Sequence, residues 1–156
     1  MDTRSVVTWT IIAALLVLTA CATSPEDERK RKEMEADIDD ILSYEHDPLE
    51  YGEAKSCLST TEFRSYRALG NRHLLFEGRQ GKLWVNVLRG RCLGLHENSI
   101  FIMRPTQANR LCDKDRFEAV DRLDASRVAS PTCVLGEFKP VTEAQVKEIR
   151  DRMEMR

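Results

Sequence analysis

The sequence has 156 residues, with 24 lysines and arginines against 26 aspartates and glutamates, and a formal net charge of −2 at pH 7. This length supports one domain of ordinary size rather than several. The charges are unevenly spread: residues 33–53 include nine acids and no Lys or Arg, whereas residues 64–91 include seven basic residues and one acid, Glu77. The chain therefore combines an acidic arm with a basic body.

The N-terminus contains a short apolar run over residues 6–20, which follows a start that carries Arg4. The run is shorter than the roughly 20 residues that a helix needs to cross the hydrocarbon core of a bilayer. A buried N-terminal helix is the alternative, but the run has no polar face. We therefore interpret residues 1–20 as a signal peptide.

The apolar run ends in Leu18-Thr19-Ala20-Cys21, which resembles the cleavage box of bacterial lipoprotein signals. The resemblance implies that Cys21 becomes the first mature residue and carries a diacylglycerol and an amide-linked acyl chain. Two or more acyl chains make such an anchor durable, because each buried CH2 contributes about 0.8 kcal/mol. Ala22 follows the cysteine, where the sorting rule known for such lipoproteins looks for Asp in proteins kept at the inner membrane. We therefore expect the protein at the periplasmic face of the outer membrane.

The remaining cysteines, Cys57, Cys92, Cys112 and Cys133, all lie in the segment that would be exported. An even number of cysteines in the oxidising periplasm favours two disulfides. A zinc site is the alternative, but structural zinc favours pairs such as C-x2-C, and these cysteines are about 20 or more residues apart. Four cysteines allow three pairings. We favour Cys92 with Cys112, joining the ends of a strand excursion, and Cys57 with Cys133, tying the beginning of the domain to its end.

The segment after Cys21 predicts a helix, with Ser24 as N-cap and Pro25 at the first helical position, which closes by Pro48. We interpret residues 21–55 as an acidic helical tether between membrane and domain. The tether carries a narrow apolar stripe at helical spacing, which consists of Met34, Ile38, Ile41 and Leu42. We expect the stripe to dock on the protein's own domain; binding of a partner through the stripe is the alternative.

Residues 56–156 form the predicted domain, and its first part has the pattern of strands. The predicted strands are 72–78, 83–88, 99–104, 116–121 and 132–138, with a hairpin turn at 79–82. The strand over 83–88 is apolar on both faces except at Asn86, as expected of a central strand. Trp84 is expected in the core rather than at a ligand surface. Short strands separated by turns favour an α+β, mainly β fold, a small antiparallel β-barrel or sandwich.

The C-terminal segment predicts a helix. Thr142 and Gln145 fit a capping box, in which each side chain binds the backbone N–H of the other residue. Val141 and Val146 stand at the positions of a hydrophobic staple. The predicted apolar face consists of Val146, Ile149 and Met153.

A pattern of cysteines and apolar pairs runs through about residues 55–150. It consists of Cys57-Leu58-Ser59, Leu83-Trp84, Arg91-Cys92-Leu93-Gly94-Leu95, Leu111-Cys112 with Asp115, and Cys133-Val134-Leu135-Gly136-Glu137-Phe138 before Pro140-Val141-Thr142. The pattern resembles a family of small exported proteobacterial proteins that is described only as a domain of unknown function. The resemblance implies four paired cysteines in an exported domain, and it carries over no catalytic residue.

The sequence contains no recognisable catalytic or metal-binding motif. His46, His73 and His96 lie far apart, outside H-E-x-x-H or a comparable spacing, and are expected at the surface or in turns. The segment 113–115 lacks the Gly and the later Glu of an EF-hand loop and predicts a turn. Ser59 lacks the G-x-S-x-G elbow, and there is no Gly-rich phosphate loop. We therefore expect no enzymatic activity, no cofactor and no metal.

These features favour a non-enzymatic lipoprotein with a structural or interaction role in the cell envelope. The alternative is a binding or inhibitory module that recognises an anionic glycan or lipid, or an acidic envelope protein, through a basic hairpin. The candidate anion-binding residues are Arg64, Arg67, Arg72, Arg79, Lys82, Arg89 and Arg91. We also expect the acids of residues 33–53 to lie near these side chains. Nucleic acid is not an expected partner, because the compartment excludes it.

Overall fold

The computed structural model describes residues 24–44, 51–122 and 130–154. No helix in these ranges has the length and apolar character that crossing a membrane requires. The predicted signal peptide, Cys21 and His46 fall outside the described residues. The lipid anchor and its membrane therefore stay predictions from the sequence.

The chain divides into two compact units, Met1–Ala36 and Asp37–Arg156. The boundary falls inside helix α2 (Pro25–Ile41), so the second unit contains the last residues of α2, the strands and helix α4 (Glu143–Glu154). The predicted tether, residues 21–55, and the predicted domain, residues 56–156, were defined by expected processing and function, so these limits stay predictions.

Helix α2 begins where the sequence predicts. The backbone N–H of Glu26 donates a hydrogen bond of 3.3 Å to Ser24 Oγ, and Pro25 is the first helical residue. Exposed ion pairs one turn apart, such as Lys30 with Glu26 at 2.9 Å, support a rod with little apolar surface. The helix ends at Ile41, whereas the prediction placed its end at Pro48.

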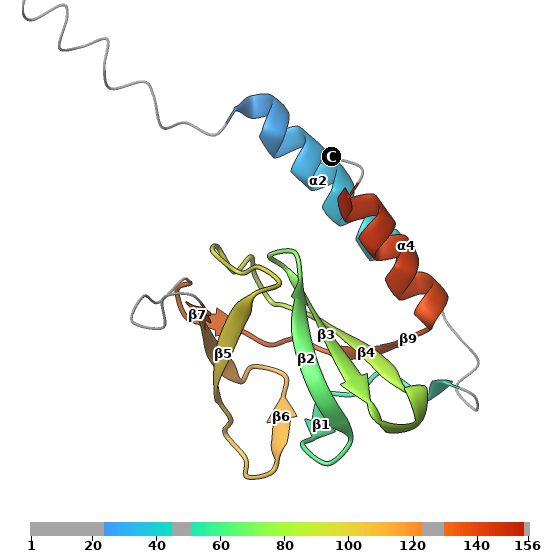
Figure 1. The fold of residues 1–156 in the computed structure, drawn as a ribbon, viewed down its shortest axis with the longest axis vertical. Coiled ribbons are helices and arrows are strands. Elements are labelled where there is room, and N and C mark those ends of the chain that lie inside the picture. The colour runs from blue at the N-terminus through green and yellow to red at the C-terminus, as the bar shows by residue number, and fades with distance from the viewer. Residues whose placement is uncertain (1–23, 45–50, 123–129, 155–156) are drawn as a thin grey trace, which may run out of the picture. The chain divides into compact units, whose positions relative to one another are not determined.

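The second unit is mainly β and all its strand pairs are antiparallel (Figure 1). The strands are β1 (Cys57–Ser59), β2 (Phe63–Leu69), β3 (His73–Gly78), β4 (Leu83–Val87), β5 (Ser99–Arg104), β6 (Arg110–Cys112), β7 (Arg116–Asp121), β8 (Cys133–Val134) and β9 (Phe138–Val141). They form sheets of order β2-β3-β4-β9, β5-β7-β8 and β1-β6. The fold is thus α+β, mainly β and sandwich-like, as predicted, and the described strands close no barrel.

The predicted strand over 132–138 is divided into β8 and β9, and Asn86 explains the break. This buried residue of β4 donates a hydrogen bond from Nδ2 to Gly136 O (2.6 Å) and accepts one at Oδ1 from Gly136 N (2.9 Å). The side chain thereby satisfies the backbone where the ladder is interrupted. A Cβ atom at position 136 would lie 2.0 Å from Val87 O, so a glycine is required there.

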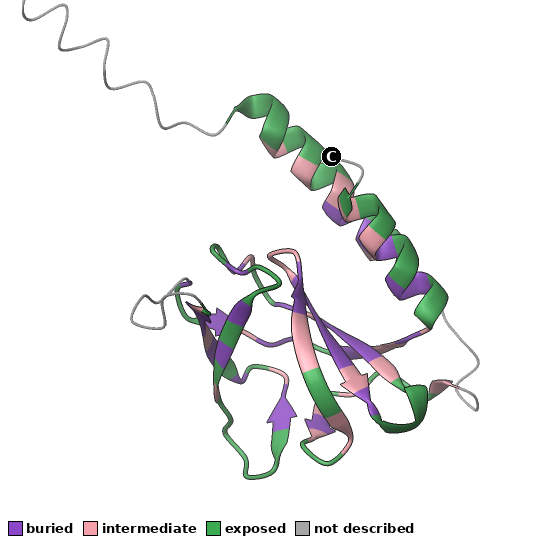
Figure 2. Ribbon diagram, viewed as in Figure 1, coloured by how far each residue is buried: buried purple, intermediate pink, exposed green. Residues whose placement is uncertain are grey.

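In the four-stranded sheet, residues on both faces of the inner strands β3 and β4 are buried. The sequence predicted this for the central strand β4. One face contributes to a large core that includes Leu74, Phe76, Trp84, Phe101, Phe117 and Phe138. Trp84 is only 4% exposed, which confirms its core position. Because side chains alternate along a strand, Leu75 and Val85 face the other side, where α4 buries Val146 and Ile149. Figure 2 shows the buried residues along the strands and on one side of α4.

Helix α4 has the predicted capping box. Gln145 N donates to Thr142 Oγ1 at 3.1 Å, and Thr142 N donates to Gln145 Oε1 at 3.0 Å. Val141 and Val146 are both buried, as a hydrophobic staple requires. The amide of Gln145 also donates to Ile41 O at 2.9 Å, which links the end of α2 to the start of α4 within the second unit.

Candidate functional site

Two disulfides brace the second unit: Cys57–Cys112 and Cys92–Cys133. The prediction of two disulfides is confirmed, but the favoured pairing was wrong. Strands β1 and β6 pair antiparallel with Cys57 directly opposite Cys112, and their Cα atoms are 4.0 Å apart. That register fixes the first bond and leaves Cys92, in the loop after β4, to join Cys133 at the start of β8.

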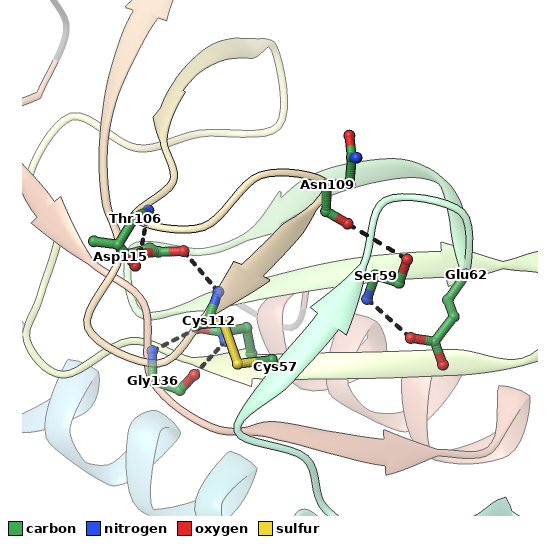
Figure 3. Close-up of a disulfide and its surroundings, with 9 residues drawn as sticks. Cys57, Ser59, Glu62, Thr106, Asn109, Cys112, Asp115 and Gly136 are labelled. Carbon is green, nitrogen blue, oxygen red and sulfur yellow. Dashed lines mark hydrogen bonds between the residues drawn. A yellow bond between two sulfur atoms is a disulfide. The ribbon is translucent and has the colours of Figure 1, made fainter.

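The first disulfide lies beside a buried carboxylate (Figure 3). Asp115 is 1% exposed; its Oδ1 accepts hydrogen bonds from Thr106 N (2.9 Å) and Thr106 Oγ1 (2.7 Å), and its Oδ2 accepts one from Cys112 N (2.7 Å). These bonds compensate the burial of the carboxylate and join the turn after β6 to the loop after β5. The turn predicted over 113–115 is confirmed. The carboxylate of Asp115, at the end of this turn, stabilises it through the hydrogen bond from Cys112 N.

A second network in the same view orders the loop between β1 and β2. Ser59 N donates to Glu62 Oε2 at 2.8 Å, and Ser59 Oγ donates to Asn109 O at 3.4 Å. Lys55 Nζ lies 2.5 Å from Glu62 Oε1, and this hydrogen bond is the main reason that the pKa of Glu62 is lowered. Ser59 therefore helps to order this loop.

The structure separates the seven basic residues that the sequence marks as candidates for anion binding. Arg67 pairs with Glu77 at 2.6 Å, Arg72 with Asp39 at 3.3 Å, and Arg89 with Asp113 at 2.5 Å. Arg91 is half-buried in the loop after β4. The remaining three are Arg64, Arg79 and Lys82, which are exposed at one end of the sheet, where β2 begins and β3 turns into β4.

Only part of the expected contact between the acidic arm and these basic residues is present among the described residues. Arg72 meets Asp39, and another basic residue, Arg152 of α4, meets Asp37 at 3.0 Å. Two residues of the predicted stripe, Ile38 and Leu42, are buried. The end of α2 thus packs into the second unit chiefly through apolar side chains.

The ion pairs shift the acidity of their carboxyl groups. The hydrogen bond from Arg89 is the main reason that the pKa of Asp113 is lowered. For Glu77, partial burial raises the pKa, but the hydrogen bond from Ser65 and the charge of Arg67 outweigh it, so the pKa of Glu77 lies below its ordinary value. Both carboxylates are therefore held in the charged form at neutral pH, which suits an ion pair and does not suit a general acid.

A groove of about 540 Å³ lies between the β2-β3-β4 end of the sheet and α4, and we call it the hairpin groove. Its apolar floor includes Leu75, Leu83 and Val146. Its charged lining consists of Arg64, Arg67, Lys147 and Arg150 together with Glu77, Glu143, Asp151 and Glu154. The lining among the described residues has balanced charge and includes no His, Cys or Ser, so the groove offers both apolar and charged binding contacts.

A family model described as "Family of unknown function (DUF6491)" matches residues 4–155. The chain belongs to this family. The match confirms the resemblance to a domain of unknown function and extends it from about residues 55–150 to almost the whole chain. Neither the curated proteins nor the solved structures contain a match. The family supplies no activity, so the function of this DUF6491 protein has to be argued from its own residues.

The histidines of this DUF6491 protein do not form a site in the described part of the chain. His96 is exposed, as predicted, 3.9 Å from Asp121. His73 is 2% exposed, which corrects the prediction of a surface or turn residue; it lies in β3 with Nε2 3.7 Å from Asp39. Leu74 to Phe76, the next residues of β3, are also buried, so His73 is buried because it belongs to a buried strand. Among residues 24–44, 51–122 and 130–154, no group of three or more His, Cys, Asp or Glu could hold a metal ion.

Proposed function

We propose that this DUF6491 protein is a lipoprotein anchored through Cys21 at the periplasmic face of the outer membrane, and that its disulfide-braced domain has a non-enzymatic interaction role in the envelope. The observation that carries the proposal is the distribution of the cysteines. The sequence has five; four are used in the two disulfides, and the fifth is Cys21, at the end of the N-terminal apolar run.

The disulfides support export, because such bonds form and persist in oxidising compartments. The described surface supports an interaction role. The buried polar side chains Asn86 and Asp115 are committed to backbone hydrogen bonds, and the hairpin groove presents apolar and oppositely charged contacts. A site of this kind can bind a partner that carries both charges.

The anchor is tested by metabolic labelling with a fatty-acid analogue. We expect wild-type protein to take the label and to fractionate with the outer membrane, and Cys21→Ser to lose the label. Ala22→Asp is the matched variant: it keeps Cys21 and the label but moves the protein to the inner membrane, if the sorting rule applies. Label that persists in Cys21→Ser, or unlabelled wild-type protein in the soluble fraction, would refute the anchor.

Recognition of an anion at the hairpin end is a second candidate function. It is favoured by Arg64, Arg79 and Lys82, which are exposed at the same end of the sheet and have no carboxylate within ion-pair distance among the described residues. The test is binding to vesicles that contain an anionic lipid, at low and high salt. We expect Arg79→Glu with Lys82→Glu to weaken binding at low salt, because the substitutions reverse the charge that attracts the lipid. We expect the difference from wild type to shrink at high salt, because salt screens exposed charges. Arg110→Glu, in the exposed part of β6, is the control and should bind almost as wild type.

A further inference from the structure

Two of the edge strands in the second unit, β2 and β5, differ in character. In the four-stranded sheet β2 is an edge strand, and in the three-stranded sheet β5 is an edge strand that pairs with β7 alone. Edge strands usually carry charges, prolines or bulges that prevent pairing with another chain. Strand β2 has a register shift between Phe63 and Ser65 and the charged side chains of Arg64 and Arg67. It is therefore protected in the usual way.

Strand β5 has no such protection along its middle. Ile100 and Ile102 are 42% and 43% exposed on its outer face, whereas Phe101 between them is buried in the core. Figure 2 shows this alternation of exposed and buried residues along the strand. Its pairing with β7 is regular over Ser99–Arg104. A regular, apolar edge of this kind is a template for strand addition.

The backbone of β7 shows which groups of β5 face the open edge. Ser130 N donates to Ala119 O at 3.2 Å, and Ala119 N donates to Ser130 Oγ at 2.8 Å, so the backbone of Ala119 points away from β5. In an antiparallel ladder, hydrogen-bonded and non-hydrogen-bonded pairs alternate. Phe101 is opposite Ala119 in the register, so the N–H and C=O groups of Phe101 point toward the open edge.

We propose that β5 is a homodimer interface, in which two copies of this chain pair their β5 strands antiparallel about a two-fold axis at Phe101. In this register the backbone groups of Phe101 pair with those of Phe101 of the second copy. Ile100 then lies opposite Ile102 of the second copy, and Ile102 opposite its Ile100. The four isoleucines form one apolar patch across the axis, and the two three-stranded sheets become one continuous sheet.

The charges at the ends of β5 favour this antiparallel arrangement. At one end, Arg104, which pairs with Glu118 at 3.3 Å, is opposite the exposed Arg116 of β7. At the other end, Ser99 is opposite Asp121, which lies 3.9 Å from His96, and the exposed Glu97 lies two residues before the strand. The two-fold axis places the basic end of each copy beside the acidic end of the other. A parallel arrangement would instead bring Arg104 of both copies together, which is unfavourable for like charges on neighbouring strands. The second copy is thus the partner whose chemistry matches this edge.

The register is tested by disulfide trapping in cells that co-express Ile100→Cys and Ile102→Cys chains. Directly opposite residues of a non-hydrogen-bonded pair have Cβ atoms about 4.5 to 5.5 Å apart, close enough to bond after small adjustment, whereas diagonal neighbours are about 7 to 8 Å apart. We expect a disulfide-linked dimer on non-reducing gels from the co-expressed pair and at least fivefold less from either variant alone. Absence of dimer from the pair, or equal dimer from the single variants, would overturn the proposal.

The association itself is tested by sedimentation equilibrium of the full chain in detergent. We expect wild type to have the mass of a dimer and Ile102→Lys that of a monomer, because each lysine would place its charge opposite Ile100 of the second copy, inside the apolar patch. Leu93→Lys is the control, since Leu93 is 61% exposed and lies outside the strand; it should remain dimeric. Wild-type monomer throughout, or the same mass for both variants, would reject the interface. The result depends on neither Cys21 nor a bound ligand, so it is independent of the proposed anchor.

Discussion

The two sides of the β3-β4 hairpin use their polar residues in different ways. On the core side, Asn86 is buried and binds the backbone of Gly136, and the buried Asp115, after β6, binds the backbone N–H groups of Thr106 and Cys112. On the α4 side, Arg67 and Glu77 line the exposed hairpin groove and pair with each other. A buried polar group that loses its partners is costly, whereas an exposed ion pair contributes little. The core side is therefore expected to contribute more to the stability of the fold than the α4 side.

The largest expected effect comes from the core side, at Gly136. Gly136→Ala would place a Cβ atom 2.0 Å from Val87 O, and the backbone shift that relieves this clash would break both hydrogen bonds with Asn86. We expect a loss of about 4 to 5 kcal/mol in the free energy of unfolding, measured by urea denaturation. Gly90→Ala is the control, because a Cβ atom there meets nothing within 4 Å. Similar stability of the two variants would show that the break between β8 and β9 is not constrained.

Removal of the first disulfide is expected to have a slightly smaller effect. Cys57 and Cys112 are separated by 55 residues, and in the chain-entropy model a loop of this size is worth about 4 kcal/mol. We expect the Cys57→Ala, Cys112→Ala double variant to lose about 3 to 4 kcal/mol in denaturation without reductant. Peptide mapping should still find Cys92 bonded to Cys133. Free Cys92 would mean that the second bond depends on the first.

The disulfide pairing also shows what the sequence could not predict. The short runs over Ser99–Arg104 and Arg116–Asp121 predict β5 and β7 at their observed bounds, and the capping box predicts α4, because these signals are local. Strands β1 and β6 have three residues each, too few for a periodic pattern, so the register that joins Cys57 to Cys112 was not visible.

The candidate site could be predicted only in part, because contacts between distant segments leave no local signal in the sequence. The basic residues are evident, but their partners Asp39 and Asp113 come from distant segments, so the ion pairs that separate them depend on tertiary structure. The hairpin groove likewise joins Arg64 of β2 to Arg150 of α4. A clue was available at Asn86, since a polar residue in an otherwise apolar central strand indicates a specific buried hydrogen-bond partner.

Substitution of the buried carboxylate of Asp115 is expected to cause a loss of stability of intermediate size. Asp115→Asn keeps the shape of the side chain but replaces one acceptor oxygen by an NH2 group, which would face either the donors of Thr106 or Cys112 N. We expect a loss of about 2 kcal/mol in the free energy of unfolding. Asp121→Asn, a half-buried aspartate at the end of β7, should lose less than half as much. Equal losses would remove the distinction between buried and exposed carboxylates.

The smallest effect is expected on the α4 side, at Glu77. Its pKa is lowered in the folded protein, so it contributes stability that is present above its ordinary pKa of 4.5 and is lost as the pH falls through the lower folded value. Because the pair with Arg67 is partly exposed, we expect Glu77→Gln to cost about 0 to 1 kcal/mol at pH 7 and almost nothing well below pH 4.5. Urea denaturation at several pH values measures this difference, and added salt should reduce it at pH 7. A loss at pH 7 as large as that of Asp115→Asn would mean that the groove side contributes as much to the stability of the fold as the core side.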